Sequence, residues 1–404
     1  MPLERPASAP PALSRLIDDL GGHYAGNALV AFIFAASGPV AIILAVGTRG
    51  GLSEADLASW IFGAFFLNGL LSIFFCWFYR QPLVFFWTIP GAVLVGPALG
   101  HLTFPQVIGA YLGCGVLMLV LGLSGLVKRA MEAIPMPIVM GMVAGVFLRF
   151  GLDLVYAIRD AFWIAAPMAV AFLALSLAPR LAKALPPVIG AMIVGGVMVV
   201  ALGRFNTAEV GGLGIVHPNF YVPQFSWRAM LELVVPLAVT VLVVQNGQGV
   251  AVLRATGHQP PINSITAACG LWSIPAALVG AVSTCLTGPV NAIITASGER
   301  QRQYTSGILV GVLALGFGLF SPVFTHLLLA TPRAFIGALA GLAMLRVLQT
   351  SFVISFGGRF TLGALVTFLV TVADVPIFNV GAAFWGLVFG FAVSWLLERK
   401  DFAK

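Results

Sequence analysis

The residues best suited to chemistry in this chain are two Thr-x-Pro motifs, Thr88-Ile89-Pro90 and Thr287-Gly288-Pro289. Proline lacks a backbone N–H and is tolerated best in the first turn of a helix, so each motif predicts that a helix begins there. The residues before them, 83–88 and 282–287, are rich in β-branched or aromatic types and are predicted to be extended. A helix that begins inside an apolar segment exposes unpaired N–H groups and partial positive charge, which favour an anion. A simple proline kink without a ligand is the alternative.

Neutral polar residues near these motifs could complete a binding site. The polar candidates are Ser37, Thr88, Gln245, Asn246, Gln248, Thr287 and Asn291, and the adjacent Gly38, Ile89, Gly91 and Gly288 belong to the same predicted site. Amide side chains are costly in lipid, so those at 245–248 are expected to face a cavity or to form hydrogen bonds between helices. Phe85 and Trp87 could form apolar walls around a ring-bearing ligand, or could simply pack.

Charged side chains are scarce where a cation or proton pathway would need them. Of 14 acidic residues, Glu232 and Asp374 alone approach the predicted membrane interior, and both lie near the ends of apolar segments. Because a cation pathway usually contains buried carboxylates, the neutral donors favour a small monoanion instead. Glu232, Asp374 and His326 are therefore peripheral candidates for proton coupling.

The composition requires a membrane setting for these residues. The chain is 60% hydrophobic and only 9% charged, whereas soluble proteins have roughly 25% charged residues. Its apolar runs are continuous and close to the length of a membrane-spanning helix, which predicts an all-α polytopic membrane protein rather than a β-barrel. The net charge of +7 is dispersed among loops, so a nucleic-acid partner is not expected. The Cys and His residues show no metal-ligand spacing, so neither a metal nor another cofactor is expected.

Apolar runs bounded by charge, proline and glycine predict about fourteen spans. They cover approximately 28–47, 57–78, 83–99, 105–127, 134–150, 161–178, 186–203, 230–253, 262–280, 283–297, 304–328, 332–348, 360–373 and 378–396. The third and tenth spans, which carry the Thr-x-Pro motifs, are predicted to be half strand and half helix. With the N-terminus inside, fifteen Arg and Lys fall in inner segments and six in outer ones, which predicts that both ends are cytoplasmic.

The two halves of the chain resemble each other weakly but in order. Residues 37–44, 88–90 and 141–145 resemble residues 246–253, 287–289 and 337–341, each at an offset of about 200 residues. An odd number of spans per half requires that the second half insert upside down, as in the inverted repeats of secondary transporters. The predicted units are a cytoplasmic tail (1–27), a first repeat (28–203), a periplasmic connection (204–229) and a second repeat (230–396).

Residues 26–39, which read GNALVAFIFAASGP, and residues 79–91, which read YRQPLVFFWTIPG, resemble the bacterial benzoate:proton symporter (BenE) family. The resemblance covers nearly the whole chain. It implies uptake of benzoate or a related aromatic carboxylate with a proton across the bacterial inner membrane. It also implies the seven-plus-seven inverted-repeat fold of nucleobase permeases and sulfate permeases. In that fold a core domain (28–127 plus 230–328) moves against a gate domain (134–203 plus 332–396), in an elevator-like or rocking manner. Substrate lies between spans 3 and 10, and a homodimer is possible.

This sequence departs from the nucleobase permeases at the expected site. Those proteins hold the base with carboxylates in spans 8 and 10, whereas this chain has Gln245, Asn246 and Gln248 in span 8 and Asn291 in span 10. The difference argues for an anion. An anion channel, or a carrier of another small anion or nucleobase on the same fold, is the alternative. An enzyme is not expected, because no acid pair, His pair or activated nucleophile appears within the spans.

Overall fold

The computed structural model describes residues 3–132, 134–178, 185–206, 214–296, 298–375, 377 and 382–402. Most of these residues are helical, as the continuous apolar runs predict. In the first half the elements are α1 (Leu13–Asp19), α2 (Gly22–Ala36), α3 (Gly38–Arg49), α4 (Glu54–Phe62), α5 (Asn68–Tyr79), β1 (Phe85–Trp87), α6 (Ile89–Ala98), α7 (Phe104–Ser124), α8 (Val127–Glu132), α9 (Met136–Asp160), α10 (Phe162–Leu177) and α12 (Pro187–Ala201).

The second half begins after the predicted connection, which is described at residues 204–206 and 214–229. Its elements are α13 (Trp227–Ala229), α14 (Val235–Val239), α15 (Gly247–Ala255), α16 (Ile262–Leu278), β2 (Thr284–Leu286), α17 (Gly288–Ile294), α18 (Tyr304–Leu319), α19 (Ser321–Leu329), α20 (Arg333–Phe356), α21 (Thr361–Ala373), α22 (Ala382–Leu397) and α23 (Arg399–Phe402). Wide π-helical turns interrupt two of the long helices, at Gly63–Leu67, Met230–Val234 and Thr240–Asn246.

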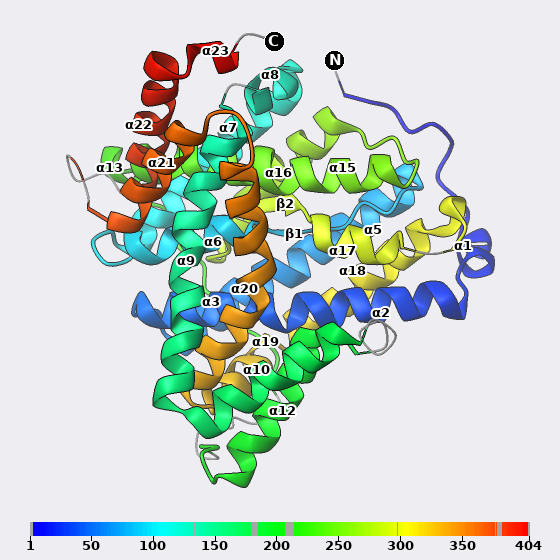
Figure 1. The fold of residues 1–404 in the computed structure, drawn as a ribbon. Coiled ribbons are helices and arrows are strands. Elements are labelled where there is room, and N and C mark those ends of the chain that lie inside the picture. The colour runs from blue at the N-terminus through cyan, green and yellow to red at the C-terminus, as the bar shows by residue number, and fades with distance from the viewer. Residues whose placement is uncertain are drawn as a thin grey trace.

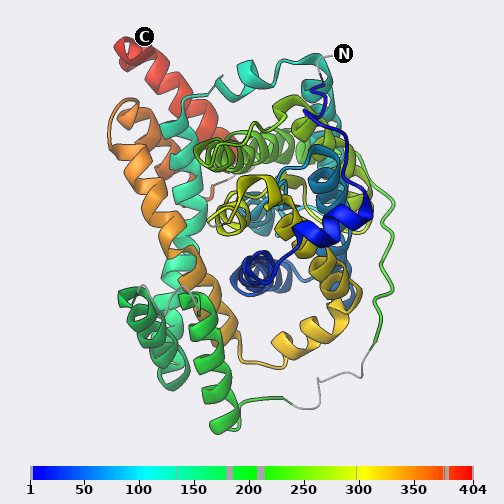
Figure 2. The same ribbon diagram turned by 90° about the vertical axis from the view of Figure 1, so that its right-hand side faces the viewer.

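The helices pack as two groups. We call α2–α7 and α13–α19, together with β1 and β2, the strand group. We call α9, α10, α12, α20, α21 and α22 the flanking group, because these helices pack mainly on one another. Figure 1 shows α9 and α20 side by side along the edge of the strand group, where they cross α2 and α3 steeply. In Figure 2 some of the strand-group helices, among them the blue α2, are seen nearly end-on beside this flanking layer.

Span length follows the sequence prediction only in part. Among the described residues, six helical segments are long and apolar enough to cross a membrane, when helices are counted through their π-helical turns and through the break at Ser37. The pair α18 and α19, bent by 67°, could form a seventh span. Six shorter apolar helices of 10–17 residues accompany them. The chain is thus a multi-pass membrane protein, while the number fourteen remains a prediction.

Two predicted spans that were expected to be continuous are broken in the structure. The first divides at Ser37, whose backbone angles (φ −97°, ψ −98°) leave the helical region between α2 and α3. The eleventh divides at Phe320, between α18 and α19. Proline lies at the first or second position of the helix after each break, at Pro39 and Pro322, and it directs the chain into a new helix.

Candidate functional site

The two Thr-x-Pro motifs lie beside one another at the centre of the strand group. Strand β1 pairs with β2 in antiparallel register, with Phe85 opposite Leu286 and Trp87 opposite Thr284. The backbone N–H of Thr88 extends the ladder by donating to the Ser283 carbonyl at 3.0 Å, and that of Thr287 donates to the Val84 carbonyl at 3.1 Å. The predicted change from extended chain to helix is present at both motifs (Figure 1), since α6 and α17 begin directly after these residues.

Four side chains hold the short strands in equivalent places. Ser72 Oγ accepts from the Phe85 N–H at 2.8 Å, and Ser273 Oγ accepts from the Thr284 N–H at 2.9 Å. Asn291 Oδ1 accepts from the Val84 N–H at 3.1 Å, and Asn246 Oδ1 accepts from the Leu286 N–H at 2.7 Å. A three-residue strand inside a membrane protein has no water to satisfy its outer backbone groups, so these side chains are needed for that purpose.

The predicted polar candidates therefore divide into occupied and available groups. Besides the two asparagines, Thr88 is occupied: its Oγ1 caps α6 by accepting from the Gly91 N–H at 3.2 Å and also donates to Thr240 Oγ1 at 3.0 Å. Within the part of the chain that the structure describes, Gln245, Gln248 and Thr287 form no side-chain hydrogen bond. Their amides and hydroxyl are thus available to a ligand.

Gln248 lies directly over the start of α17. A Cβ atom built on Gly288 would lie 2.6 Å from Gln248 Cγ and 2.7 Å from Gln248 Oε1, which is closer than real Cβ contacts allow. Glycine is thus required at 288 so that the Gln248 amide can reach this helix end. Thr287 is 8% exposed and precedes Gly288, so its hydroxyl and the Gln248 amide border the same helix start.

The remaining sequence candidates have packing positions. Phe85 packs edge-on against Phe75, and the Trp87 ring lies 4.9 Å from Phe65, both within the interior of the strand group. The buried Trp87 Nε1–H has no partner among the described residues. Ile89 is half-buried at the start of α6. Gly91 lies against Thr88, which leaves no room for a side chain.

Ser37 and Gly38 lie where the two helix groups meet. Ser37 Oγ donates to the Phe34 carbonyl at 3.0 Å, so the hydroxyl satisfies a backbone group at the helix break. A Cβ atom on Gly38 would lie 2.4 Å from Ala343 Cβ on α20 and 3.2 Å from Val188 Cγ1 on α12. Gly38 therefore allows a close approach of α3 to the flanking group.

The peripheral acids line a cavity that the sequence did not reveal. This cavity, which we call the charged cavity, has a volume of about 750 Å³. Its walls are α3, α6 and the Met230–Val234 segment on one side and α9, α21 and α22 on the other. The titratable residues in its lining are Arg49, His101, Arg149, Asp153, Tyr156, Glu232 and Asp374. The cavity reaches Val93 and Leu94, which lie in the second turn of α6.

Opposite charges are paired across the charged cavity. Arg49 on α3 forms an ion pair with Asp153 on α9, which joins the strand group to the flanking group. Burial raises the pKa of the Asp374 carboxyl, and the positive charge of Arg149 acts against that rise. His326, by contrast, lies outside the cavity lining and pairs with Glu54 at 3.3 Å.

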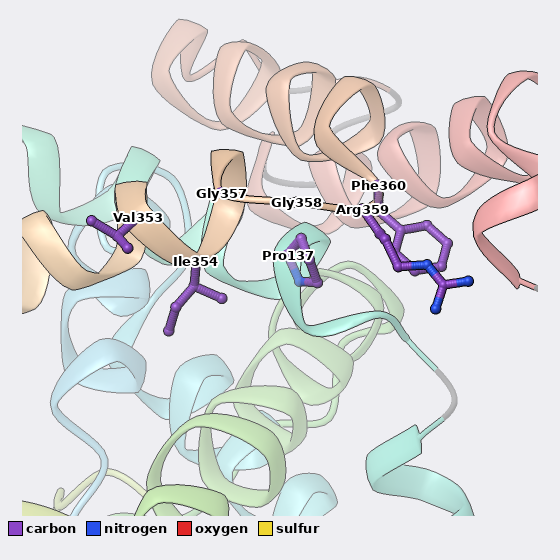
Figure 3. Close-up of a pocket in the computed structure, with 7 residues that line it drawn as sticks. All are labelled: Pro137, Val353, Ile354, Gly357, Gly358, Arg359 and Phe360. Carbon is purple, nitrogen blue, oxygen red and sulfur yellow. The ribbon is translucent and has the colours of Figure 1, made fainter. Parts of the chain in front are cut away.

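A second pocket, of about 540 Å³, lies between the start of α9 and the turn from α20 to α21. Figure 3 shows its lining, in which Pro137, Val353, Ile354 and Phe360 are apolar and Arg359 is the charged residue. None of the predicted site residues contributes to this pocket.

Comparison with known proteins agrees with the resemblance seen in the sequence. A family model described as "Benzoate membrane transport protein" matches residues 22–396. The inner membrane protein YdcO of Escherichia coli K12 is 30% identical over 355 residues, covering 87% of this chain and 89% of that protein. The benzoate membrane transport protein of Acinetobacter baylyi is 26% identical over 375 residues, covering 92% and 94%.

Solved structures share the fold at low sequence identity. The transmembrane domain of the cyanobacterial bicarbonate transporter BicA has a TM-score of 0.62 at 16% identity, covering 92% of this chain and 98% of that one. SLC26A9 has a TM-score of 0.65 at 15% identity, and the match spans 92% of this chain but 64% of SLC26A9. With its family model matched from residue 22 to residue 396, the chain belongs to the benzoate membrane transport protein family, whose members are membrane transporters and not enzymes.

Proposed function

We propose that the chain carries benzoate or a similar aromatic carboxylate into the cell together with a proton, by alternating access. The observation that carries this proposal is the family match over residues 22–396, in a chain whose paired half-helix starts are surrounded by neutral polar groups. A carboxylate suits such a place because backbone N–H groups and amides can donate to it without a competing charged side chain.

The substrate-binding residues follow from which side chains are available. We assign binding of the substrate carboxylate to Thr287 and Gln248, with Gln245 nearby, since these side chains have no other partner in the described chain. Thr88, Asn246 and Asn291 position the strands and the start of α6. Gly38, at the helix break after Ser37, lies against Ala343 of α20.

The strand group and the flanking group correspond to the core and gate domains expected from the resemblance. Ser72 and Ser273 accept equivalent hydrogen bonds from the two strand segments, and so do Asn291 and Asn246. These equivalent bonds support two repeats related by symmetry. We infer that the strand group moves against α9 and α20, and that the charged cavity opens to the outside, as the positions of Arg49 and Arg149 in predicted outer segments suggest. Cytoplasmic termini and a homodimer complete the proposal, the latter by analogy of fold alone.

The test is uptake of radiolabelled benzoate by proteoliposomes. Protein-free liposomes are measured in parallel and subtracted, because uncharged benzoic acid crosses bilayers unaided. A carrier shows saturable uptake and counterflow against preloaded benzoate, and an acid exterior accelerates its uptake. Current without saturation would favour an anion channel instead, while competition by uracil or sulfate, but not by benzoate analogues, would refute the substrate.

Variants test the assigned site within the same assay. A hydrogen bond to a charged group contributes about 1.5–3 kcal/mol, so Thr287→Val and Gln248→Ala should each raise the half-saturating benzoate concentration by about tenfold or more. The matched control is Gln349→Ala, which removes an exposed amide at the far end of α20. Equal half-saturation in all three variants would show that the carboxylate binds elsewhere.

A further inference from the structure

The charged cavity contains a buried carboxylate with a titratable partner. Glu232 is 5% exposed, and among the described residues it is the one Asp, Glu, Lys or Arg that is buried. Removing a carboxylate from water costs several kcal/mol unless it is paired and hydrogen-bonded. His101 Nε2 lies 2.9 Å from Glu232 Oε2 and 3.1 Å from Oε1, so the imidazole contacts both oxygens.

The two members of the pair differ in their access to water. The Glu232 side chain is covered, whereas the side chain of His101 is 26% exposed and lines the charged cavity. Because Nε2 is engaged by the carboxylate, it carries the hydrogen of the neutral imidazole, and Nδ1 can accept a proton from the cavity. Protonation then produces an imidazolium–carboxylate ion pair, in which the buried charge of Glu232 is balanced.

Other charged groups face this pair from every side of the cavity. Arg49 of α3 is paired with Asp153 of α9, and Arg149 of α9 interacts with Asp374 at the end of α21. Arg228, at the start of the helix that contains Glu232, has interactions of its own. The positive charge of Arg149 and that of His101 both act on Asp374, but the hydrogen-bond contacts of the His101 imidazole are with Glu232.

Both members of the pair belong to the strand group. His101 follows α6, and Glu232 lies in the Met230–Val234 segment, which continues through α14 to the residues around the strand pair. Leu237 of α14 lies against Gly91 in the first turn of α6. Leu237 is five residues beyond Glu232 in the sequence, which corresponds to roughly 8 Å along a helix axis. The pair is thus separate from the substrate residues but belongs to the same group of helices.

We propose that the His101–Glu232 pair is the proton-binding site of the transport cycle, an assignment that rests on the proposed proton-coupled uptake. The imidazole accepts one proton from the outer solution through the charged cavity and releases it to the inner solution after the strand group has moved. An aromatic carboxylate adds one negative charge to the moving group, and the bound proton adds one positive charge. The empty and the fully loaded groups therefore have the same net charge while they move past α9 and α20.

The experiment separates coupling from substrate exchange. Benzoate counterflow at equal pH on both sides measures exchange, and the initial rate with the exterior one pH unit more acid measures coupling, each corrected with protein-free liposomes. Symport of one proton permits up to about tenfold accumulation for one pH unit. We expect Glu232→Gln and His101→Gln to keep counterflow within about threefold of wild type and to lose the acceleration by external acid.

Two further variants make the test specific. Asp160→Asn removes an exposed carboxylate of α9 outside the cavity lining and should remain accelerated by external acid. Asp374→Asn removes the other candidate carboxylate of the lining, and asparagine readily adopts the positive φ of 52° at this position. Loss of acid acceleration in Asp374→Asn alone would overturn the proposal.

Normal acceleration by external acid in both Glu232→Gln and His101→Gln would also overturn the proposal. If Glu232→Gln does not fold, the result for His101→Gln alone decides whether the proposal holds. Failure of the wild-type protein to show counterflow would instead refute the proposed function. The two failures are therefore distinguishable.

Discussion

Gly38 allows a sharp test of how the strand group contacts the flanking group. Alanine at this position would place its Cβ 2.4 Å from Ala343 Cβ, whereas non-bonded carbon atoms are at their optimum at about 3.5–4.0 Å. The two helices must therefore separate by about 1 Å or more, because neither Cβ can rotate away. Overpacking of this kind typically costs about 1–3 kcal/mol. We expect Gly38→Ala to lower thermal stability and to reduce uptake.

The second substitution of this test is Ala343→Gly, which removes the opposing methyl group. Alone, it should cost about 1 kcal/mol through helix propensity. Combined with Gly38→Ala, it should restore much of the lost stability and uptake, so that the double variant is better than the sum of the single effects predicts. In the double variant, the shortest remaining contact of the new Cβ at position 38 is with Val188 Cγ1, at 3.2 Å.

Gly26, in the preceding helix α2, provides the matched control, because a Cβ there meets nothing within 4 Å. Gly26→Ala should be neutral or slightly stabilising. Thermal unfolding in detergent and benzoate uptake measure all four proteins. The reasoning fails if Gly38→Ala behaves like Gly26→Ala, or if Ala343→Gly does not rescue it.

Three further predictions concern stability in detergent. Asn291→Leu leaves the Val84 N–H without its acceptor and removes one of the two donors to the Val84 carbonyl. It should cost about 2–4 kcal/mol in unfolding free energy, and a neutral result would contradict the strand-holding role. Thr88→Val removes a helix cap worth about 1 kcal/mol, whereas Thr287→Val should leave the melting temperature unchanged because the Thr287 side chain caps nothing. Burial lowers the pKa of His258 in the loop after α15. The unfolded chain then binds a proton more readily than the folded one, so stability should fall as pH drops below about 6.5, and His258→Asn should reduce this dependence in a pH series of melting curves.

The sequence predicted the helix starts at Thr88 and Thr287 because proline leaves a direct signal in the chain. The break at Ser37 carried the same signal in Gly38-Pro39, but the long apolar run around it concealed the interruption. Sequence also identified the polar side chains near the strands without revealing their partners. A three-residue strand pair needs acceptors for its outer N–H groups, and only the register shows that Asn246 and Asn291 supply them.

The charged cavity lay beyond the reach of sequence reasoning for a different reason. Its seven titratable groups lie between residues 49 and 374 of the sequence, and no local pattern brings all of them together. His101 carries no local signal of its role, because its partner Glu232 is 131 positions away. Tertiary packing alone creates this pair.

The wide turns in the helix that contains Glu232 and Asn246 affect how relatives of this chain should be aligned. A π-helical turn arises when a helix holds one residue more than regular α-helical geometry needs. Each additional residue rotates everything after it by about 100° around the axis. The segment Met230–Val234 precedes Asn246, and the segment Thr240–Asn246 ends at it. A homologue with a single-residue deletion here would therefore need its alignment gap inside the helix, not in a loop, to keep the asparagine opposite Leu286.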